Sequence, residues 1–238
     1  MKIIIMAAGR GTRISRHIQG RPKCTIDIDG RPLIARTFKI LSEFPGTDIA
    51  IVTGYNEQAV IEAIGRHTYT KFLNPFFDVT NSIASLWFAR EFIPADDDLI
   101  VMNGDLFFEK KVMETLYAEA RSPVMLADSS RIKEADYRFK WSGDVLQKYG
   151  KDLSNDETTG EYVGLAKISR TSIPAFRQRM HELIDAQAHG KWWEDILYSW
   201  VPEGHSVFVK DVKGLFWGEV DYIEDIERLR AEAKHRGL

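Results

Sequence analysis

Residues suited to binding a polyphosphate gather near the start of the chain, in the segment MAAGRGTR at residues 6–13. Gly9 and Gly11 would let the backbone of this loop approach a ligand closely and adopt positive φ angles. Successive backbone N–H groups in such a loop can surround an anion. Arg13 and, further along the chain, Lys23 would add positive charge, and an arginine can bind two phosphate oxygens at once. The segment therefore predicts a polyphosphate site.

Two familiar phosphate-binding loops do not fit this segment. A P-loop would need the pattern Gly-x-x-x-x-Gly-Lys-Ser/Thr, which GRGTRIS lacks. A dinucleotide-binding loop would need a third glycine where Ile14 stands. The six histidines show no zinc-binding spacing, and a single cysteine excludes both a cysteine metal cluster and an internal disulfide. That residue, Cys24, is expected to be a small buried hydrophobe, with a reactive thiol as the alternative.

The composition fits a soluble globular protein, because 44% of the 238 residues are hydrophobic and 28% are charged. This length suits one large domain, or one domain with a small lobe. A formal net charge of −3 gives no field that would attract nucleic acid or an anionic membrane, so neither is expected as a partner. No apolar run approaches the roughly 20 residues of a membrane span, and the first residues do not resemble a signal peptide. A cytoplasmic location is the simplest expectation.

The first half of the chain has the pattern of alternating strands and helices. Short apolar runs predict buried strands, and apolar residues at helical spacing predict helices, with Pro32 at an early helical position. Strands are expected at 3–7, 48–54, 68–73 and 98–105, and helices at 31–43, 57–67 and 82–92. This order indicates an open α/β sheet with right-handed crossovers. Ligands bind beyond the carboxyl ends of the strands in such sheets, which is where the glycine-rich loop would lie.

The second half changes character after about residue 130. The sequence Ser-Gly-Asp inside 138–153 predicts a hairpin turn between two strands. Pro174 and Gly190 are expected to interrupt the helical pattern of 170–200. Further strands are expected at 161–169, 205–212 and 214–220, and a charged amphipathic helix at the C-terminus, ending at Gly237.

The motifs, taken in order, resemble one family. A-A-G-x-G-T-R followed by Pro22 and Lys23 is similar to the signature of nucleotidyltransferases that activate phosphorylated small molecules. This family includes sugar-1-phosphate nucleotidylyltransferases and phosphocholine or phosphonate cytidylyltransferases, with a MobA-like NTP transferase fold. The resemblance continues through DIDGRPLIART, TNSIASLWFARE, MNGD and WGEVDYIEDIERL, and so covers most of the chain.

The resemblance implies a Rossmann-like open mixed sheet flanked by helices, of the nucleotide-diphospho-sugar transferase type, with a small acceptor-binding lobe. The whole chain, 1–238, would be one nucleotidyltransferase domain. Within it, 1–130 would form the NTP-binding core, 131–220 the acceptor-binding lobe and 221–238 the C-terminal helix.

The resemblance also implies a reaction, in which an acceptor phosphate or phosphonate oxygen attacks the α-phosphorus of an NTP and pyrophosphate leaves. Such a displacement depends mainly on alignment and charge neutralisation. Lys23, Arg13 and Asp105 are the implied catalytic residues, and Lys23 would neutralise the α-phosphate and the attacking oxygen. The implied nucleotide-binding residues are Ala7, Ala8, Gly9, Gly11, Thr12, Arg13, Asn81, Ser82 and Ser85.

Mg²⁺ is the implied cofactor, and Asp105 and Asp221 are its implied ligands. Asp105 ends an apolar strand, so its carboxylate would project at the ligand edge of the sheet. Mg²⁺ prefers carboxylates, water and phosphate oxygens. Asp105 could instead form a turn, and Asp221 could cap the last helix, which begins directly after it. Glu219 is the alternative second ligand.

The acceptor is expected to contact Lys151, Glu161, Gly164 and Asp128. Lys151 stands where sugar nucleotidyltransferases carry Glu-Lys-Pro, and the missing Glu and Pro argue against a hexose bound in the usual way. Aromatic residues of the second half could hold an ammonium group by cation–π attraction, beside Asp128, Asp136 or Glu161. The alternative, that most of these aromatics fill the core, is favoured.

The sequence therefore predicts Mg²⁺-dependent transfer of CMP from CTP to a small molecule such as phosphocholine or aminoethylphosphonate, with release of pyrophosphate. The preference for CTP depends on the similarity of TNSIASL to cytidylyltransferases. Two alternatives stay open: a sugar-1-phosphate nucleotidylyltransferase using UTP, GTP or dTTP, and a non-catalytic nucleotide-binding regulatory domain. A homodimer is considered, and Arg10 has no assigned role.

Overall fold

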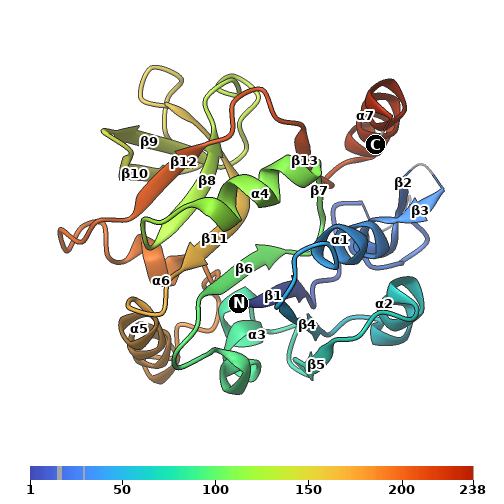
Figure 1. Ribbon diagram of the computed structural model, residues 1–238, viewed down its shortest axis with the longest axis horizontal. Coiled ribbons are helices and arrows are strands. Elements are labelled where there is room, and N and C mark those ends of the chain that lie inside the picture. The colour runs from blue at the N-terminus through green and yellow to red at the C-terminus, as the bar shows by residue number, and fades with distance from the viewer. Residues whose placement is uncertain (15–17, 29, 238) are drawn as a thin grey trace.

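The computed structural model describes residues 1–14, 18–28 and 30–237. Its centre is a nine-stranded mixed sheet with helices on both faces (Figure 1). From one edge to the other the strands are β5 (Thr70–Leu73), β4 (Asp48–Thr53), β1 (Lys2–Ala7), β6 (Leu99–Asn103), β11 (Gly160–Ile168), β8 (Val124–Asp128), β12 (Phe208–Asp211), β10 (Val145–Gly150) and β9 (Arg138–Ser142).

Two small ribbons and the helices complete the fold. The ribbons pair β2 (Asp27–Ile28) with β3 (Arg31–Pro32), and β7 (Leu106–Phe108) with β13 (Trp217–Glu219). The α-helices are α1 (Leu33–Leu41), α2 (Glu57–Ile64), α3 (Ser82–Phe88), α4 (Lys110–Ala118), α5 (Ile173–Asp185), α6 (Asp195–Tyr198) and α7 (Ile223–Arg236).

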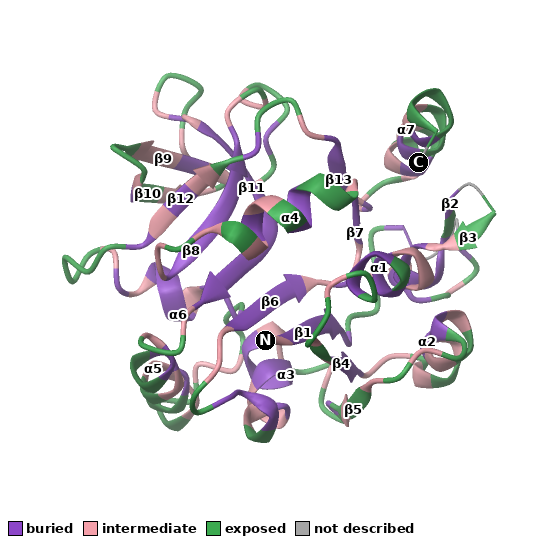
Figure 2. Cartoon of the chain, viewed as in Figure 1, coloured by how far each residue is buried: buried purple, intermediate pink, exposed green. Residues whose placement is uncertain are grey.

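The central strand β1 has no polar face because both of its sides are covered. Ile3 and Ile5 pack with buried residues of α1, α2 and α4. Ile4 and Met6 pack on the other face, with residues of α3, α5 and α6. Fully burying one such side chain contributes about 1.5–3 kcal/mol. Figure 2 shows the result as a continuous buried band along the middle of the sheet.

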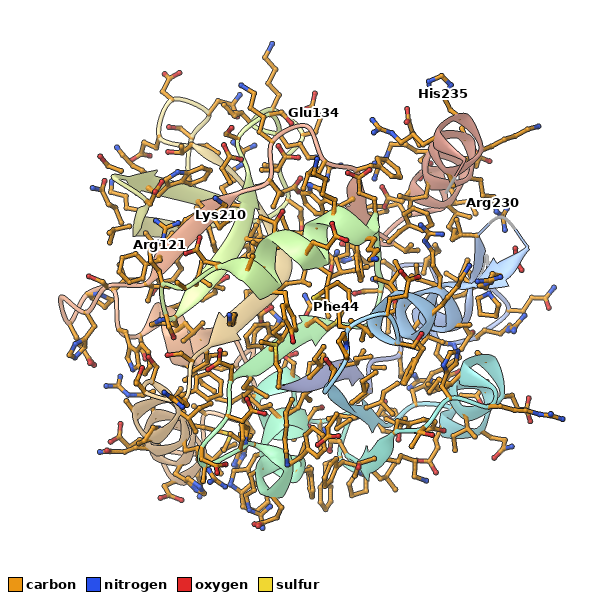
Figure 3. All side chains as sticks on the ribbon, viewed as in Figure 1. Phe44, Arg121, Glu134, Lys210, Arg230 and His235 are labelled. Atoms are coloured by element: carbon orange, nitrogen blue, oxygen red, sulfur yellow. The ribbon has the colours of Figure 1, made fainter. Side chains whose placement is uncertain are left out.

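The C-terminal helix α7 packs over the β2–β3 ribbon. Leu229 of α7 belongs to the same buried cluster as Ile28 and Leu33. Arg230, labelled in Figure 3, donates hydrogen bonds to the Asp27 carbonyl oxygen at 3.2 and 2.8 Å. The end of the chain is thereby joined to the segment that follows the glycine-rich loop.

The open mixed sheet is confirmed, and the elements differ from those predicted in four ways. The β2–β3 ribbon was not predicted, and its strand Arg31–Pro32 lies where the helix was expected to begin. Pro32 precedes α1 instead of standing inside it. Pro174 lies in the first turn of α5, where its missing N–H costs nothing, and so it begins a helix that it was expected to interrupt. The elements β7, α4 and β8, between 106 and 128, were not predicted.

The change of character near residue 130 does not coincide with a break in the sheet. Strand β11, from the second half of the chain, is antiparallel to both of its neighbours and lies between β6 and β8 of the first half. Among the described residues no helix is long and apolar enough to cross a membrane.

Candidate active site

A cavity of about 400 Å³ opens at the carboxyl ends of β1 and β6. It extends from the glycine-rich loop to aromatic residues of the second half of the chain. Of the predicted site residues, it brings together Ala7, Ala8, Gly9, Gly11, Thr12, Arg13, Lys23, Asn81, Ser82, Ser85, Asp105, Lys151, Glu161, Gly164 and Asp221.

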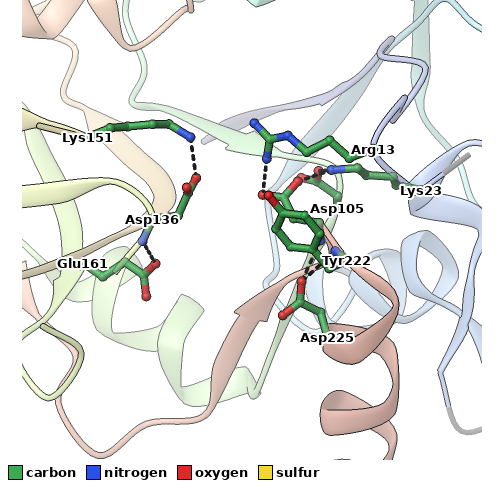
Figure 4. A network of polar contacts seen from close by, with 9 residues as sticks. Arg13, Lys23, Asp105, Asp136, Lys151, Glu161, Tyr222 and Asp225 are labelled. Carbon is green, nitrogen blue, oxygen red and sulfur yellow. Dashed lines mark hydrogen bonds and ion pairs between the residues drawn. The ribbon is translucent and has the colours of Figure 1, made fainter. Parts of the chain in front are cut away.

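Lys23, Asp105 and Asp221 meet at one end of this cavity. The Lys23 Nζ atom lies 3.3 Å from Asp105 Oδ2 and also donates to Asp221 Oδ1. Arg13 Nη1 donates to the other oxygen of Asp221 at 3.0 Å. Figure 4 shows the two cations and Asp105 facing one another. Two positive and two negative side chains therefore form one compact network.

The β7–β13 ribbon explains how the two aspartates meet although they are far apart in the sequence. Leu106 pairs with Glu219 in this antiparallel ribbon. Just beyond that pair, the Val220 N–H donates to the Asp105 carbonyl oxygen at 3.1 Å. The carboxylates of Asp105 and Asp221 consequently leave the same end of the ribbon.

Asp221 is not used as a helix cap. The carboxylate of Asp225 accepts the N–H groups of Asp221 and Tyr222 at 3.0 and 2.8 Å, at the start of α7. The Asp221 side chain is thereby left to contact Lys23 and Arg13, and the alternative that it caps the last helix is wrong.

The electrostatics of this end favour bound cations. Burial would lower the pKa of Lys23, but the charges of Asp105 and Asp221 outweigh burial and raise that pKa to about 12. Burial, reinforced by the same two aspartates, raises the pKa of Glu219 well above its usual value. Acidic groups are thus crowded around one point, and a positive charge placed among them would stabilise their ionised forms.

This donor set fits Mg²⁺. Two carboxylates converge on the position of a cation, the Lys23 ammonium, and carboxylate oxygens are the ligands that Mg²⁺ prefers. In the part of the chain that the structure describes, no group of three or more His, Cys, Asp or Glu side chains forms a closed metal site. The two aspartates would therefore share the ion with water and phosphate oxygens.

Gly11 gives Lys23 the space to reach the aspartates. Its φ angle is +60°, and a Cβ atom there would lie 2.6 Å from Lys23 Cγ. Arg10, on the neighbouring position, is directed elsewhere. Its guanidinium lies 3.3 Å from Asp78 Oδ1 and 5.1 Å from the centre of the Tyr55 ring.

The residues predicted to contact the nucleoside already have partners within the protein. Asn81 Oδ1 accepts the N–H of Ser82 at 2.8 Å and so caps α3. Ser85 Oγ accepts a hydrogen bond from the Asn74 side chain at 2.9 Å. Ser82 Oγ accepts the backbone N–H of Trp193 at 2.9 Å. All three of the predicted residues still line the cavity.

The opposite end of the cavity carries the predicted acceptor residues. Lys151 Nζ pairs with Asp136 at 2.7 Å, and the Asp136 N–H donates to Glu161 at 2.7 Å (Figure 4). Arg131 pairs with the other oxygen of Glu161 at 3.2 Å. Gly164 lies at an irregularity of β11 with φ +92°, and a Cβ there would lie 3.1 Å from the Asn103 amide nitrogen.

Asp128, also predicted to contact the acceptor, is not among the residues that line the cavity. Its carboxylate is buried and accepts hydrogen bonds from the Trp217 indole at 2.8 Å and from Ser130. Asp128 stands opposite Glu161 in the pairing of β8 with β11, but its carboxylate is engaged by Trp217 and Ser130.

Glu194 was missed by the sequence analysis. Only 6% of it is exposed, and it lines the cavity beside Trp192 and Tyr198. Burial raises its pKa to about 8, and within the described residues no cationic side chain pairs with it. The available signal was an acid placed within the apolar stretch WWEDILYSW.

Cys24 is buried, as expected for a small hydrophobe. Burial raises the pKa of its thiol to about 12, so the thiol stays protonated near neutral pH. A protonated thiol is a poor nucleophile.

Comparison with known proteins assigns the chain and its fold to one family. The model of the MobA-like NTP transferase domain matches residues 3–237. The chain belongs to this family. The predicted family and enzyme class are thereby confirmed, because the relatives are named nucleotidyltransferases.

Two relatives are similar over nearly the whole chain. One is the CMP-5'-(3-aminopropyl)phosphonate synthase of Streptomyces rubellomurinus, 29% identical over 93% of this chain and 37% of that protein. The other is the CTP:phosphoglutamine cytidylyltransferase of Campylobacter jejuni, 22% identical over 95% of this chain and 98% of that protein. The chain thus spans about a third of the first relative and almost all of the second.

A solved structure shares the fold. The CTP:phosphocholine cytidylyltransferase of Streptococcus pneumoniae superposes with a TM-score of 0.78 at 18% identity, over 97% of this chain and 98% of that one. Its likeness confirms the nucleotide-diphospho-sugar transferase type of architecture.

Proposed function

We propose that this chain transfers CMP from CTP, with Mg²⁺, to a phosphorylated or phosphonylated small molecule that carries an ammonium group, and releases pyrophosphate. The observation that carries the proposal is the meeting of Lys23, Arg13, Asp105 and Asp221 at the end of the cavity that the glycine-rich loop lines. The convergence of two carboxylates beside two cationic side chains favours catalysis over nucleotide binding alone.

The cationic side chains and the loop would bind and align the triphosphate. Arg13 and the backbone N–H groups of Gly9 and Gly11 would face its oxygens. Lys23, which stays protonated, would neutralise charge at the α-phosphate as the acceptor oxygen attacks it. Mg²⁺, held by Asp105 and Asp221, would supply further charge neutralisation on the phosphates.

CTP is proposed as the nucleotide on two grounds. The segment TNSIASL resembles cytidylyltransferases, and both relatives named above have cytidylyl chemistry in their names. The residues predicted to contact the base and those predicted to contact the acceptor line one cavity, so the two substrates could meet without a large rearrangement.

An ammonium-bearing acceptor is proposed because the far end of the cavity combines acids with aromatic rings. Glu194 is a buried carboxyl group whose ionised form a bound cation would stabilise. Trp192 and Tyr137, whose ring centres lie 5.6 Å apart, line the same end, and an aromatic face attracts a cation. An aminoalkyl group also occurs in the name of the Streptomyces relative.

Pyrophosphate release from a matrix of substrates tests this function. The full chain with Mg²⁺ would be given CTP, UTP, GTP or dTTP, each with 3-aminopropylphosphonate, aminoethylphosphonate, phosphocholine or glucose 1-phosphate. We expect turnover with CTP and an ammonium-bearing acceptor. Preference for another nucleotide by an order of magnitude, or for glucose 1-phosphate, would support the sugar-1-phosphate alternative. Nucleotide binding without turnover for every pair would support the regulatory domain.

A further inference from the structure

We infer that Ser82 positions the acceptor-binding residues and is not a contact of the nucleotide. The inference depends on the proposed function, because it concerns the acceptor end of that site. Its basis is the contact between the start of α3 and residues 189–195, here called the docking segment. This segment carries Trp192 and Glu194, which line the acceptor end of the cavity.

The docking segment is hydrogen-bonded to the start of α3 through its backbone. The N–H of Asn81 donates to the carbonyl oxygen of His189 at 2.8 Å, and the N–H of Ile83 donates to that of Lys191 at 3.2 Å. The Asn81 side chain donates to the Gly190 carbonyl oxygen at 3.3 Å. Backbone N–H groups at a helix start need partners from outside the helix. Here the docking segment supplies them, so these groups are already used and are not directed at a nucleotide.

Ser82 adds the central bond of this contact. Its Oγ accepts the backbone N–H of Trp193 at 2.9 Å, and the Trp193 indole N–H donates to Asn103 Oδ1 at 3.0 Å. Trp193 is fully buried and therefore fixed at two points. Its neighbours on either side, Trp192 and Glu194, line the cavity. The Ser82 hydroxyl thus helps to fix where these two side chains stand.

Removing this hydroxyl should affect the acceptor and spare CTP. Ser82→Ala would leave the Trp193 N–H without an acceptor in a half-buried place, which favours movement of the docking segment. Trp192 and Glu194 would then lose their fixed positions. The described hydrogen bonds of Arg13 and Lys23 go to Asp221 and Asp105, while that of Ser82 goes to Trp193, so triphosphate binding should persist.

Ser85 is the matched control. It stands on the same helix and lines the same cavity, but its Oγ accepts from Asn74, in the loop before α3. Ser85→Ala should therefore not reproduce the selective effect on the acceptor. Ser82→Thr keeps a hydroxyl at the position and should restore acceptor binding. Trp193→Phe removes the indole bond to Asn103, which is the second hydrogen bond that holds Trp193, and so tests whether the position of Trp193 matters for acceptor binding.

The experiment measures KM for CTP and for 3-aminopropylphosphonate separately, by pyrophosphate release, in the full chain and these variants. We expect Ser82→Ala to raise the acceptor KM about tenfold with the CTP KM within about twofold, and Trp193→Phe to act in the same direction. A rise in the CTP KM alone, or equal rises in both, would overturn the inference and leave the proposed function standing.

Direct binding separates failure of the inference from failure of the function. If the wild-type chain releases no pyrophosphate with any acceptor, the proposed function fails. Calorimetric titration of 3-aminopropylphosphonate in the presence of CTP then measures the acceptor Kd and tests the inference about Ser82 alone. Weaker acceptor binding in Ser82→Ala than in Ser85→Ala supports it. Equal binding in the two variants, or no binding to the wild type, overturns it.

Discussion

At the scale of single residues, the balance of charge around Lys23 determines what the site can bind. Lys23 and Arg13 face Asp105 and Asp221, and all four side chains border the cavity. Each could be predicted because each stands in a recognisable local context, a signature loop or the end of an apolar strand. Their mutual contact could not be predicted, because it depends on the pairing of β7 with β13 between distant parts of the chain.

Replacing Asp105 by asparagine tests the metal assignment. Asp105→Asn removes one of two negative charges and an anionic metal ligand. We therefore expect kcat to fall about 100-fold and the Mg²⁺ concentration that gives half-maximal activity to rise. Steady-state kinetics over a Mg²⁺ titration measure both. Asp48→Asn, at an exposed position that begins β4, serves as control. Unchanged turnover and metal dependence in Asp105→Asn would exclude Asp105 as a ligand.

Glu194 gives a prediction for stability against pH. Burial, helped by the charges of Asp195 and Asp105, raises the pKa of Glu194 to about 8 from an unfolded value of 4.5. Between these values the folded chain keeps a proton that the unfolded chain has released, so this group lowers the free energy of unfolding as the pH rises. Glu194→Gln cannot titrate. The free energy of unfolding of Glu194→Gln, relative to that of the wild type, should therefore rise from about pH 5 to about pH 8.

Denaturant unfolding of the wild type and of Glu194→Gln across this pH range measures the difference. Other titrating groups are common to both chains and cancel. A difference that stays constant with pH would mean that the folded chain holds Glu194 ionised. Glu194 itself could not be located from the sequence, because an acid in an apolar stretch has no motif and only the folded chain shows that it borders a cavity.

At the scale of elements, the glycine-rich loop leaves space that the Lys23 side chain occupies. Gly11 has a positive φ angle, and its missing side chain admits Lys23. The sequence indicated that the loop needs glycine for phosphate contact. It did not indicate that one glycine makes room for Lys23, because that contact joins the loop to the 3₁₀ turn Lys23–Thr25.

Gly11→Ala should harm the enzyme in two ways. A left-handed conformation costs a non-glycine residue about 1–2 kcal/mol, and the new methyl group would displace Lys23 from the aspartates. We expect a lower melting temperature and a lower kcat. Gly9→Ala is the matched variant for stability, because a Cβ there meets nothing within 4 Å. Equal melting temperatures for the two variants would contradict the steric account.

The elements that could be predicted were those with a strong local pattern. Continuous apolar runs located β1, β4 and β6, and the Ser-Gly-Asp turn located the β9–β10 hairpin. Helix α4 carries Val112, Met113 and Leu116 at helical spacing, so a local signal for it existed and was not used. The order of strands in the sheet has no local signal, since pairing joins residues far apart in the chain.

At the scale of the whole molecule, β11 binds the two halves of the chain into one sheet. It pairs with β6 on one side and with β8 on the other, and all of its residues are buried. The halves that were expected to act as a core and a lobe therefore share a central strand. A lobe that moved as a separate body would have to break the pairing of β11 with its neighbours.

Unfolding should therefore occur in one transition for both halves. Separating either half exposes the edge of a buried strand together with its apolar faces, which is unfavourable for an isolated part. Urea unfolding followed by tryptophan fluorescence and by far-ultraviolet circular dichroism should give coincident curves. Two resolved transitions would show that the halves are independent folding units.

The same strand has a consequence for synthesis of the chain on the ribosome. β6 and β8 are made well before β11, yet each depends on β11 for one edge. Until residue 168 has emerged, a nascent chain would present one open edge of β6 and both edges of β8, whose other neighbour β12 is made later still, and such edges promote aggregation. Truncated products ending before β11 should thus be insoluble, and the growing chain should need a chaperone over this interval.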